Sequence, residues 1–180
     1  MDINTLQSSL CNVQECSENA TIIETDNSAT LRKITICNVP QGSILIKMDE
    51  AKFNNFFKGL KEWGYNRHCD YALVTDQDIY FFEMKSQNSI NQNLLESCKT
   101  KFLSDQCVIK YADTIFDILL NKERFFEKRK QHFVLFYQAN SLNKTSTFPH
   151  KQKQSTVGSP TNFQKIPIAN EGIVSLDRII

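Results

Sequence analysis

The sequence predicts an α/β or α+β domain with one central mixed β-sheet flanked by helices. Three observations support this fold class. Short runs of β-branched and aromatic residues, bounded by turn residues, are typical of strands. Two longer stretches carry apolar residues at helical spacing, and the two kinds of segment alternate along the chain. The 180 residues, of which 41% are hydrophobic and 13 are phenylalanine, suffice for one such domain with its own core.

The chain is expected to divide into three parts. Residues 1–28 are polar and carry five carboxylates but no Lys or Arg, which predicts an acidic lead-in, either a tail or a loosely attached segment. Residues 29–140 hold the α/β core. Residues 141–180 begin as a polar, basic loop that is too long for an ordinary connection, so it is either mobile or functional. The loop leads to a small terminal strand pair attached to the core, over 165–169 and 172–179.

The first half of the core opens with two predicted strands. The run from Leu31 to Lys47 favours two short strands around a turn at Pro40–Gly42. Asp49 follows as a candidate cap for a helix over 51–63, in which bulky apolar residues recur at helical spacing. Gly64 stands where such a helix would end.

The second half of the core begins with a predicted hairpin. Strands over 69–74 and 79–85 are joined by a polar turn at Thr75–Asp78, and the second strand is apolar on both faces, as in the middle of a covered sheet. A helical stretch follows from about 90 to 120, with a break expected near Ser104–Asp105. Its expected apolar positions are Leu94, Leu95, Cys98, Phe102, Ile115, Ile118 and Leu119. A last core strand is predicted over 132–138.

Composition limits the functional classes. None of the six cysteines forms a C-x-x-C pair and no His has zinc-finger spacing, which argues against a structural zinc. We expect no signal peptide and no membrane span, because the chain lacks a run of about 18 apolar residues. These features favour reduced thiols in a cytoplasmic protein.

Net charge is +1, but basic residues are concentrated in two places. One is the segment Lys122–Lys130, and the other is the stretch from Ser141 to Lys165, which has no Asp or Glu. Either could contact a nucleic-acid backbone. A solvated helix end is the commoner explanation for the first, and a flexible surface loop explains the second at least as well. The candidate contacts are Lys128, Arg129, Lys130, Lys144, Lys151 and Lys153.

Three charged residues on the hairpin form the constellation that suggests chemistry. Glu83 and Lys85 are two apart on a strand, so their side chains leave the same face. Pairing across the turn is expected to put Tyr71 opposite Lys85 and Asp70 just beyond it. Because charges in a buried strand need partners, the set predicts a counter-ion, a metal ion or a water pocket.

Two carboxylates beside one lysine suit phosphodiester hydrolysis. The carboxylates are hard oxygen ligands for Mg²⁺ or Mn²⁺, which polarises the phosphate and lowers the pKa of an attacking water. The lysine would orient that water or stabilise charge in the transition state. The alternative is purely structural: Glu83 and Lys85 form an ion pair near the end of the sheet, while Asp70 caps the turn from Gly64.

The run CDYALVTDQDIYFFEMKS resembles the PD-(D/E)XK nuclease superfamily, whose signature is an Asp at a strand start followed by Glu or Asp, any residue and Lys on the next strand. Those positions are Asp70, Glu83 and Lys85, and the predicted helices lie where that fold puts them. Cys69 stands at the place of the signature Pro. The resemblance implies a restriction-endonuclease-like core.

The resemblance also implies residue roles and an activity. Asp70 and Glu83 would hold Mg²⁺ or Mn²⁺, Lys85 would serve catalysis, and Glu62 from the first helix is the best candidate for a further metal ligand. Behind Glu62 stand Asp49, Glu50 and Glu24, and Gln92 is at the position of a polar residue that some relatives carry. The implied protein is a metal-dependent endonuclease in restriction or anti-phage defence, with DNA as the expected substrate and RNA as the alternative.

Other functions stay open from the sequence. A domain of the same fold could bind nucleic acid or a partner protein without cutting, or the chain could be a structural subunit that docks through its long polar loop. Small nucleases without a recognition domain often act as homodimers or in larger complexes, so either assembly is expected here.

Overall fold

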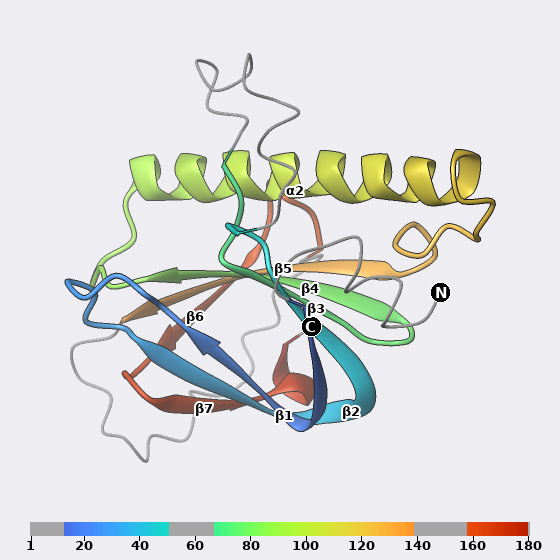
Figure 1. The fold of residues 1–180 in the computed structure, drawn as a ribbon. Coiled ribbons are helices and arrows are strands. Elements are labelled where there is room, and N and C mark those ends of the chain that lie inside the picture. Colours follow the sequence, from blue (N-terminus) through green and yellow to red (C-terminus); the bar gives the residue numbers. More distant parts are fainter. Residues whose placement is uncertain (1–12, 51–66, 139–157, 180) are drawn as a thin grey trace.

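The computed structural model describes residues 13–50, 67–138 and 158–179, and the following concerns these ranges. They form a seven-stranded mixed sheet with one long α-helix, which confirms the α+β class and the central mixed sheet (Figure 1). The strands are β1 (Val13–Ile23), β2 (Lys33–Lys47), β3 (Tyr71–Val74), β4 (Asp78–Lys85), β5 (Lys130–Gln138), β6 (Gln164–Ile168) and β7 (Gly172–Ser175). The helix is α2 (Gln92–Ile118), and a 3-10 turn, η3 (Leu176–Arg178), follows β7.

The sheet has an antiparallel half and a parallel half. Its order is β1-β2-β3-β4-β5-β6, and β7 pairs with β2. Strands β1, β2, β3 and β4 pair antiparallel in succession, β5 is parallel to both β4 and β6, and β7 is parallel to β2. Helix α2 makes the crossover between the parallel strands β4 and β5, as such a connection requires. Strand β4 therefore lies at the junction of the two halves.

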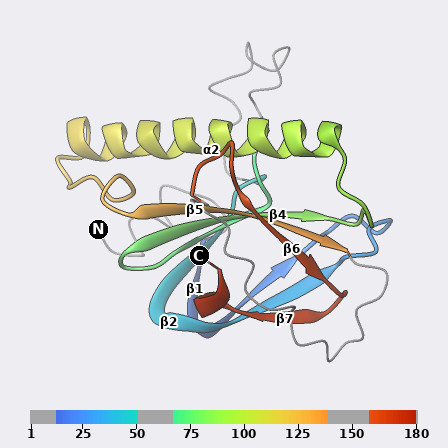
Figure 2. The same cartoon turned by 180° about the vertical axis from the view of Figure 1, so that it is seen from behind.

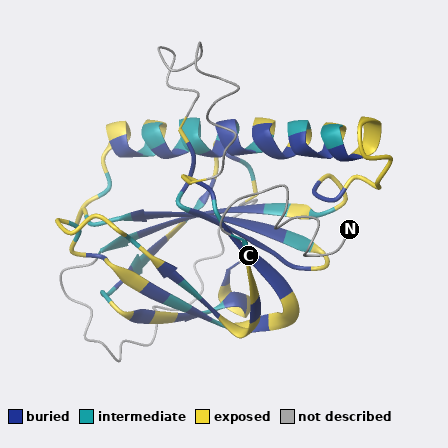
Figure 3. Cartoon of the chain, viewed as in Figure 1, coloured by how far each residue is buried: buried dark blue, intermediate teal, exposed yellow. Residues whose placement is uncertain are grey.

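The layers are a helix, a sheet and a second, curled part of the same sheet. Helix α2 lies over β3, β4 and β5, while β1, β2 and β7 curl beneath them (Figures 1 and 2). One apolar core fills the space between α2 and the sheet, and a second fills the curl. Phe81 of β4 belongs to the first core and Phe82 to the second, so β4 is covered on both faces, as its sequence predicts. Buried positions follow the sheet-facing side of α2 (Figure 3).

Helix α2 is continuous. The Asn91 side chain caps it by accepting a hydrogen bond from the Leu94 N–H at 2.8 Å. The predicted break near Ser104–Asp105 is wrong, because both residues lie on the buried side of the helix. Ile118 and Leu119 are 71% and 73% exposed, so they do not extend the apolar face, contrary to expectation.

Strand β2 is one long strand, and the predicted pair of strands with a turn at Pro40–Gly42 is wrong. The residues expected to turn form an irregularity instead. From Ser43 to Val39, β2 advances four positions while its partner β1 advances two, from Cys16 to Glu18. Gly42 adopts φ = +78° there, a conformation that costs glycine little. The extra residues are absorbed as a bulge because β1 continues to pair on both sides of it.

The first and last described strands near the two ends of the chain belong to the sheet. Residues 13–23 of the expected lead-in form β1 and pair with β2, so they are neither a tail nor loosely attached. The predicted terminal strands are present as β6 and β7, but they pair with β5 and β2 rather than with each other. The helix predicted over 51–63 and most of the basic loop lie outside the described residues.

The β3–β4 hairpin sets the geometry of the candidate site. Its tight turn is closed by the Thr75 N–H, which donates to the Asp78 carbonyl at 2.9 Å, and by the Thr75 hydroxyl, which accepts from the Asp78 N–H at 3.0 Å. Tyr71 is opposite Phe82 and not opposite Lys85 as expected. The turn centred on residues 76 and 77 requires this register, which brings Asp70 beside Glu83.

Within the described ranges, no helix has the length and apolar content needed to span a lipid bilayer. The five cysteines in those ranges are free thiols: Cys16, Cys37, Cys69, Cys98 and Cys107.

Candidate functional site

Asp70 is placed at the start of β3 by backbone pairing on both sides. Its N–H donates to the Phe82 carbonyl at 3.0 Å, and its carbonyl accepts from the Met48 N–H at 3.0 Å. The regular pairing of β3 with β4 ends at this point, which would leave the Met84 N–H without a strand partner. The Asp70 carboxylate supplies one, accepting that N–H through Oδ2 at 2.6 Å. The other carboxylate oxygen of Asp70, Oδ1, faces the ammonium of Lys101.

Glu83 and Lys85 project from β4 on the side of the sheet covered by α2. Strand alternation puts them on the face of Phe81, which packs in the core beneath the helix. The Glu83 side chain is completely buried, whereas Lys85 is 28% exposed. The Lys85 ammonium lies 2.5 Å from Glu83 Oε1. The expected same-face pair is therefore a direct ion pair at the rim of the core.

Lys101 of α2 completes the cluster from above the sheet. Its ammonium donates to Glu83 Oε1 at 2.6 Å and lies 3.9 Å from Asp70 Oδ1. The Lys101 side chain is 17% exposed. Because one ammonium contacts both acids, the carboxylates of Asp70 and Glu83 face a common space. We call these four residues (Asp70, Glu83, Lys85 and Lys101) the acid cluster.

Burial dominates the electrostatics of the acid cluster. Desolvation, and then the nearby Glu83 carboxylate, raise the pKa of Asp70 from 3.8 to about 7, although Lys101, the Met84 N–H and Lys85 oppose the shift. Burial disfavours the charged form of Lys101, but Glu83 and Asp70 outweigh it and raise the pKa of that ammonium. Burial also raises the pKa of the neighbouring Cys98 thiol to about 12, so this thiol is neutral at physiological pH.

The residues present fit a divalent cation in donor chemistry. Glu83 Oε2 is buried and has no hydrogen-bond partner, although an unpaired buried carboxylate oxygen is costly. The neighbouring Asp70 adds a second hard oxygen ligand of the kind that Mg²⁺ and Mn²⁺ prefer. Among the residues that the structure describes, no group of three or more His, Cys, Asp or Glu is arranged to hold a metal ion. The fit thus rests on two carboxylates.

A second polar group on α2 fixes the start of β3. One turn beyond Lys101, the Asp105 carboxylate lies 2.8 Å from His68 Nδ1 and accepts the Cys69 N–H at 3.0 Å. All three residues are buried. Asp105 thereby ties the backbone just before Asp70 to the helix that carries Lys101. His68 is engaged in this contact.

The additional ligands expected from the sequence are not found in the acid cluster. Glu62 lies outside the described residues. The charges that act on Asp49 are Lys47, Glu50 and Glu24, and Glu50 forms an ion pair with Lys47. Gln92 donates to Glu96 at 3.1 Å on the exposed start of α2. The groups that most affect the pKa of Asp70 are Glu83, Lys101, the Met84 N–H and Lys85, and none of the four described candidates is among them.

The predicted basic contacts within the described residues lie away from the acid cluster. Lys130 is opposite Asp78, whereas Leu135 is opposite Glu83, so the two places are five residues, or about 16 Å, apart along β5. Arg129 donates to the Thr75 carbonyl at 2.7 Å and stacks 3.9 Å from the Phe125 ring centre, and Lys128 pairs with Glu123 at 2.8 Å. Lys144, Lys151 and Lys153 lie outside the described residues.

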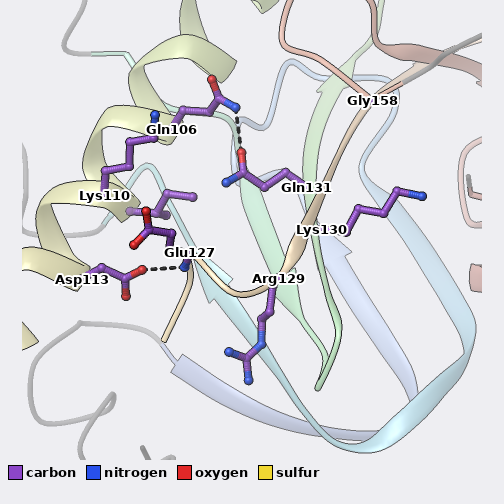
Figure 4. A pocket seen from close by; sticks show the side chains of 9 residues that line it. Gln106, Lys110, Asp113, Glu127, Arg129, Lys130, Gln131 and Gly158 are labelled. Carbon is purple, nitrogen blue, oxygen red and sulfur yellow. Dashed lines mark hydrogen bonds between the residues drawn. The ribbon is translucent and has the colours of Figure 1, made fainter. Parts of the chain in front are cut away.

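A polar cleft of about 400 Å³ opens beside the second half of α2 (Figure 4). Its charged lining residues are Lys110, Asp113, Glu127, Arg129 and Lys130. Gln106 donates to Gln131 across it at 2.7 Å. No member of the acid cluster lines this cleft, so this cleft and the candidate chemistry are at different places.

Sequence reasoning missed two functional positions on α2, Lys101 and Asp105. A signal was available, because buried positions recur every three or four residues from Leu94 through Cys98, Phe102 and Asp105 to Ile109. A charged residue within or beside that stripe must reach a partner on the sheet. The predicted helix break near Ser104–Asp105 concealed this regularity.

Comparisons with protein-family models, with curated proteins and with solved structures found no match for this chain.

Proposed function

We propose that the chain is a metal-dependent nuclease of PD-(D/E)XK type that hydrolyses phosphodiester bonds, with DNA as the preferred substrate. The observation that carries the proposal is that Asp70 and Glu83 converge on one ammonium, that of Lys101, while the second Glu83 oxygen, Oε2, is buried without a hydrogen-bond partner. The mixed β-sheet, with α2 crossing between the parallel strands β4 and β5, agrees with the restriction-endonuclease-like core that the sequence motif suggests.

Each residue has a distinct part in the proposed reaction. Asp70 Oδ1 and the Glu83 carboxylate would hold Mg²⁺ or Mn²⁺, which supplies a Lewis acid and lowers the pKa of an attacking water. Met84 fixes the Asp70 carboxylate by hydrogen bonding its other oxygen. Lys85, the more exposed of the two lysines, can turn its ammonium toward substrate to orient the water or stabilise charge on the phosphate.

The setting of this activity belongs to the same proposal. We place the nuclease in the cytoplasm, in restriction or anti-phage defence, acting as a homodimer or as part of a larger complex. The free thiols of the described cysteines agree with a reducing compartment.

One observation favours a second candidate, a catalytically silent domain that binds nucleic acid or a partner protein. The two lysines already offer two positive charges to the two carboxylates, so the acid cluster is paired without a metal ion. A silent domain should keep its melting temperature when Mn²⁺ is added, whereas a protein that binds the ion is stabilised by mass action.

Lys85→Met separates chemistry from metal binding. We expect Mn²⁺-dependent cleavage to fall about 100-fold or more, because the group that assists the water and the developing charge is lost. We also expect the Mn²⁺-induced rise in melting temperature to persist, because Asp70 and Glu83 remain. Cleavage of plasmid DNA and thermal denaturation with and without Mn²⁺ measure the two effects.

Lys110→Met is the matched control, since it removes an exposed lysine from α2 outside the acid cluster. It should leave both measurements near wild type. Equal cleavage rates for Lys85→Met and wild type would exclude the proposed role of Lys85. A wild-type protein that neither cuts nor gains stability with Mn²⁺ would favour the silent domain.

A further inference from the structure

Lys101 has a place in the acid cluster that the sequence motif does not provide for. The ion pair of Glu83 and Lys85 lies within one strand, but Lys101 reaches the same oxygen, Glu83 Oε1, from the helix packed above. It is also the ammonium close to Asp70 Oδ1, at 3.9 Å. Lys101 therefore contacts both of the carboxylates that would hold the metal ion.

We propose that Lys101 is a built-in counter-cation of the acid cluster, which a divalent metal ion must displace from the carboxylates in order to bind. The proposal rests on the proposed function, because it concerns how the same two ligands become available. It adds a regulatory competition between a residue of α2 and the metal ion.

The geometry indicates that Lys101 competes with a metal ion for the two carboxylates and does not help to bind it. A metal ion shared by Asp70 and Glu83 needs an oxygen from each carboxylate, and the Lys101 ammonium already lies 2.6 Å from Glu83 Oε1 and 3.9 Å from Asp70 Oδ1. A divalent cation placed there would lie close to a positive charge in a poorly hydrated setting, where like charges repel strongly. The ammonium must therefore move away when the ion arrives.

The burial of Glu83 gives a physical reason for a lysine at position 101. Glu83 is completely buried, and a buried carboxylate without a counter-charge would destabilise the fold. The Lys101 side chain is largely buried, and the length of its alkyl chain lets the charged end reach Glu83. A lysine can satisfy the metal-free state and still swing aside, since its stem is flexible. The partly exposed side chain leaves an outward path for the ammonium.

The test is the affinity for Mn²⁺ alone, measured by isothermal titration calorimetry at pH 8 on the full chain without nucleic acid. Lys101→Met removes the charge and keeps the apolar stem, and Lys101→Gln does the same while keeping a hydrogen-bond donor for Glu83. We expect either variant to bind Mn²⁺ at least fivefold more tightly than wild type. Lys110→Met, on the exposed side of α2, should bind like wild type.

The outcomes separate this inference from the proposed function. Tighter binding by a folded Lys101 variant supports the competition. Unchanged or weaker binding in both variants, while wild type binds Mn²⁺, overturns the competition and leaves the nuclease proposal intact. Failure of wild type and both variants to bind Mn²⁺ overturns both. Circular dichroism establishes that each variant is folded before titration. If Lys101→Met does not fold, the Mn²⁺ affinity of Lys101→Gln tests the competition.

Discussion

Asp113→Ala is expected to lower the free energy of unfolding by about 3–4 kcal/mol. The buried Asp113 carboxylate accepts hydrogen bonds from three successive backbone N–H groups, those of Phe125, Phe126 and Glu127, at 2.5–3.0 Å. Alanine would leave these donors unpaired beneath α2, where Phe125 and Phe126 are themselves buried. These hydrogen bonds hold the loop that contains Phe125, Phe126 and Glu127, and this loop leads directly into β5, the parallel neighbour of β4. Urea denaturation at pH 7 measures the loss.

Asp117→Ala is the matched control on the same helix. Asp117 is 48% exposed and pairs with Arg124, so its loss should change the free energy of unfolding by less than about 1 kcal/mol. Asp113→Asn, which keeps one acceptor oxygen, should fall between the two. A loss of under about 1 kcal/mol for Asp113→Ala would mean that aromatic packing of Phe125 and Phe126, rather than this carboxylate, holds the loop.

Asp70→Asn is expected to stabilise the metal-free protein at alkaline pH. Burial and Glu83 raise the pKa of Asp70 from 3.8 to about 7 in the folded state. The folded protein therefore prefers the neutral carboxyl group, and this favourable contribution is present in full below about pH 4. It is lost as the pH rises through about 7. At pH 8.5 the asparagine variant should exceed wild type by up to about 4 kcal/mol in free energy of unfolding.

Urea denaturation in EDTA at pH 5.5, 7 and 8.5 tests this dependence, and the advantage of Asp70→Asn should grow at each step. The amide oxygen of asparagine can still accept the Met84 N–H, so the strand register is kept. Asp177 is a control of opposite sign, because hydrogen bonds from Asn38 and Ser175 lower its pKa. Asp177→Asn should gain nothing at pH 8.5. A constant difference between Asp70→Asn and wild type across the three pH values would contradict the account.

The sequence predicts those parts of the fold that depend on local pattern. The β3–β4 hairpin follows from apolar runs around a polar turn, and the double-sided burial of β4 follows from its unbroken apolar run. The bulge in β2 is not visible locally, because Pro40–Gly42 has the composition of a turn and only pairing with β1 holds it in a strand. The acidic segment 13–23 forms a strand for the same reason.

The candidate site was predictable in part. Asp70, Glu83 and Lys85 come from two strands joined by a short turn, so counting residues across the turn is enough to bring them together. Lys101 comes from the next element, and its contact with Glu83 depends on how α2 lies over the sheet. Spacing within a single element cannot supply that contact. Only the burial of a charged residue on an apolar helix face could indicate it.

The central claim is that Asp70 and Glu83 support metal-dependent cleavage. Its most direct test is incubation of wild type and Glu83→Gln with plasmid DNA, single-stranded DNA and RNA in Mn²⁺, with EDTA as the blank. Glu96→Gln, an exposed acid of α2, is the control for charge removal. We predict that wild type and Glu96→Gln cut at least one substrate only when Mn²⁺ is present, and that folded Glu83→Gln cuts it at least about 100-fold more slowly. Cleavage that survives EDTA or Glu83→Gln, or a wild type that cuts none of the three substrates, would contradict the account.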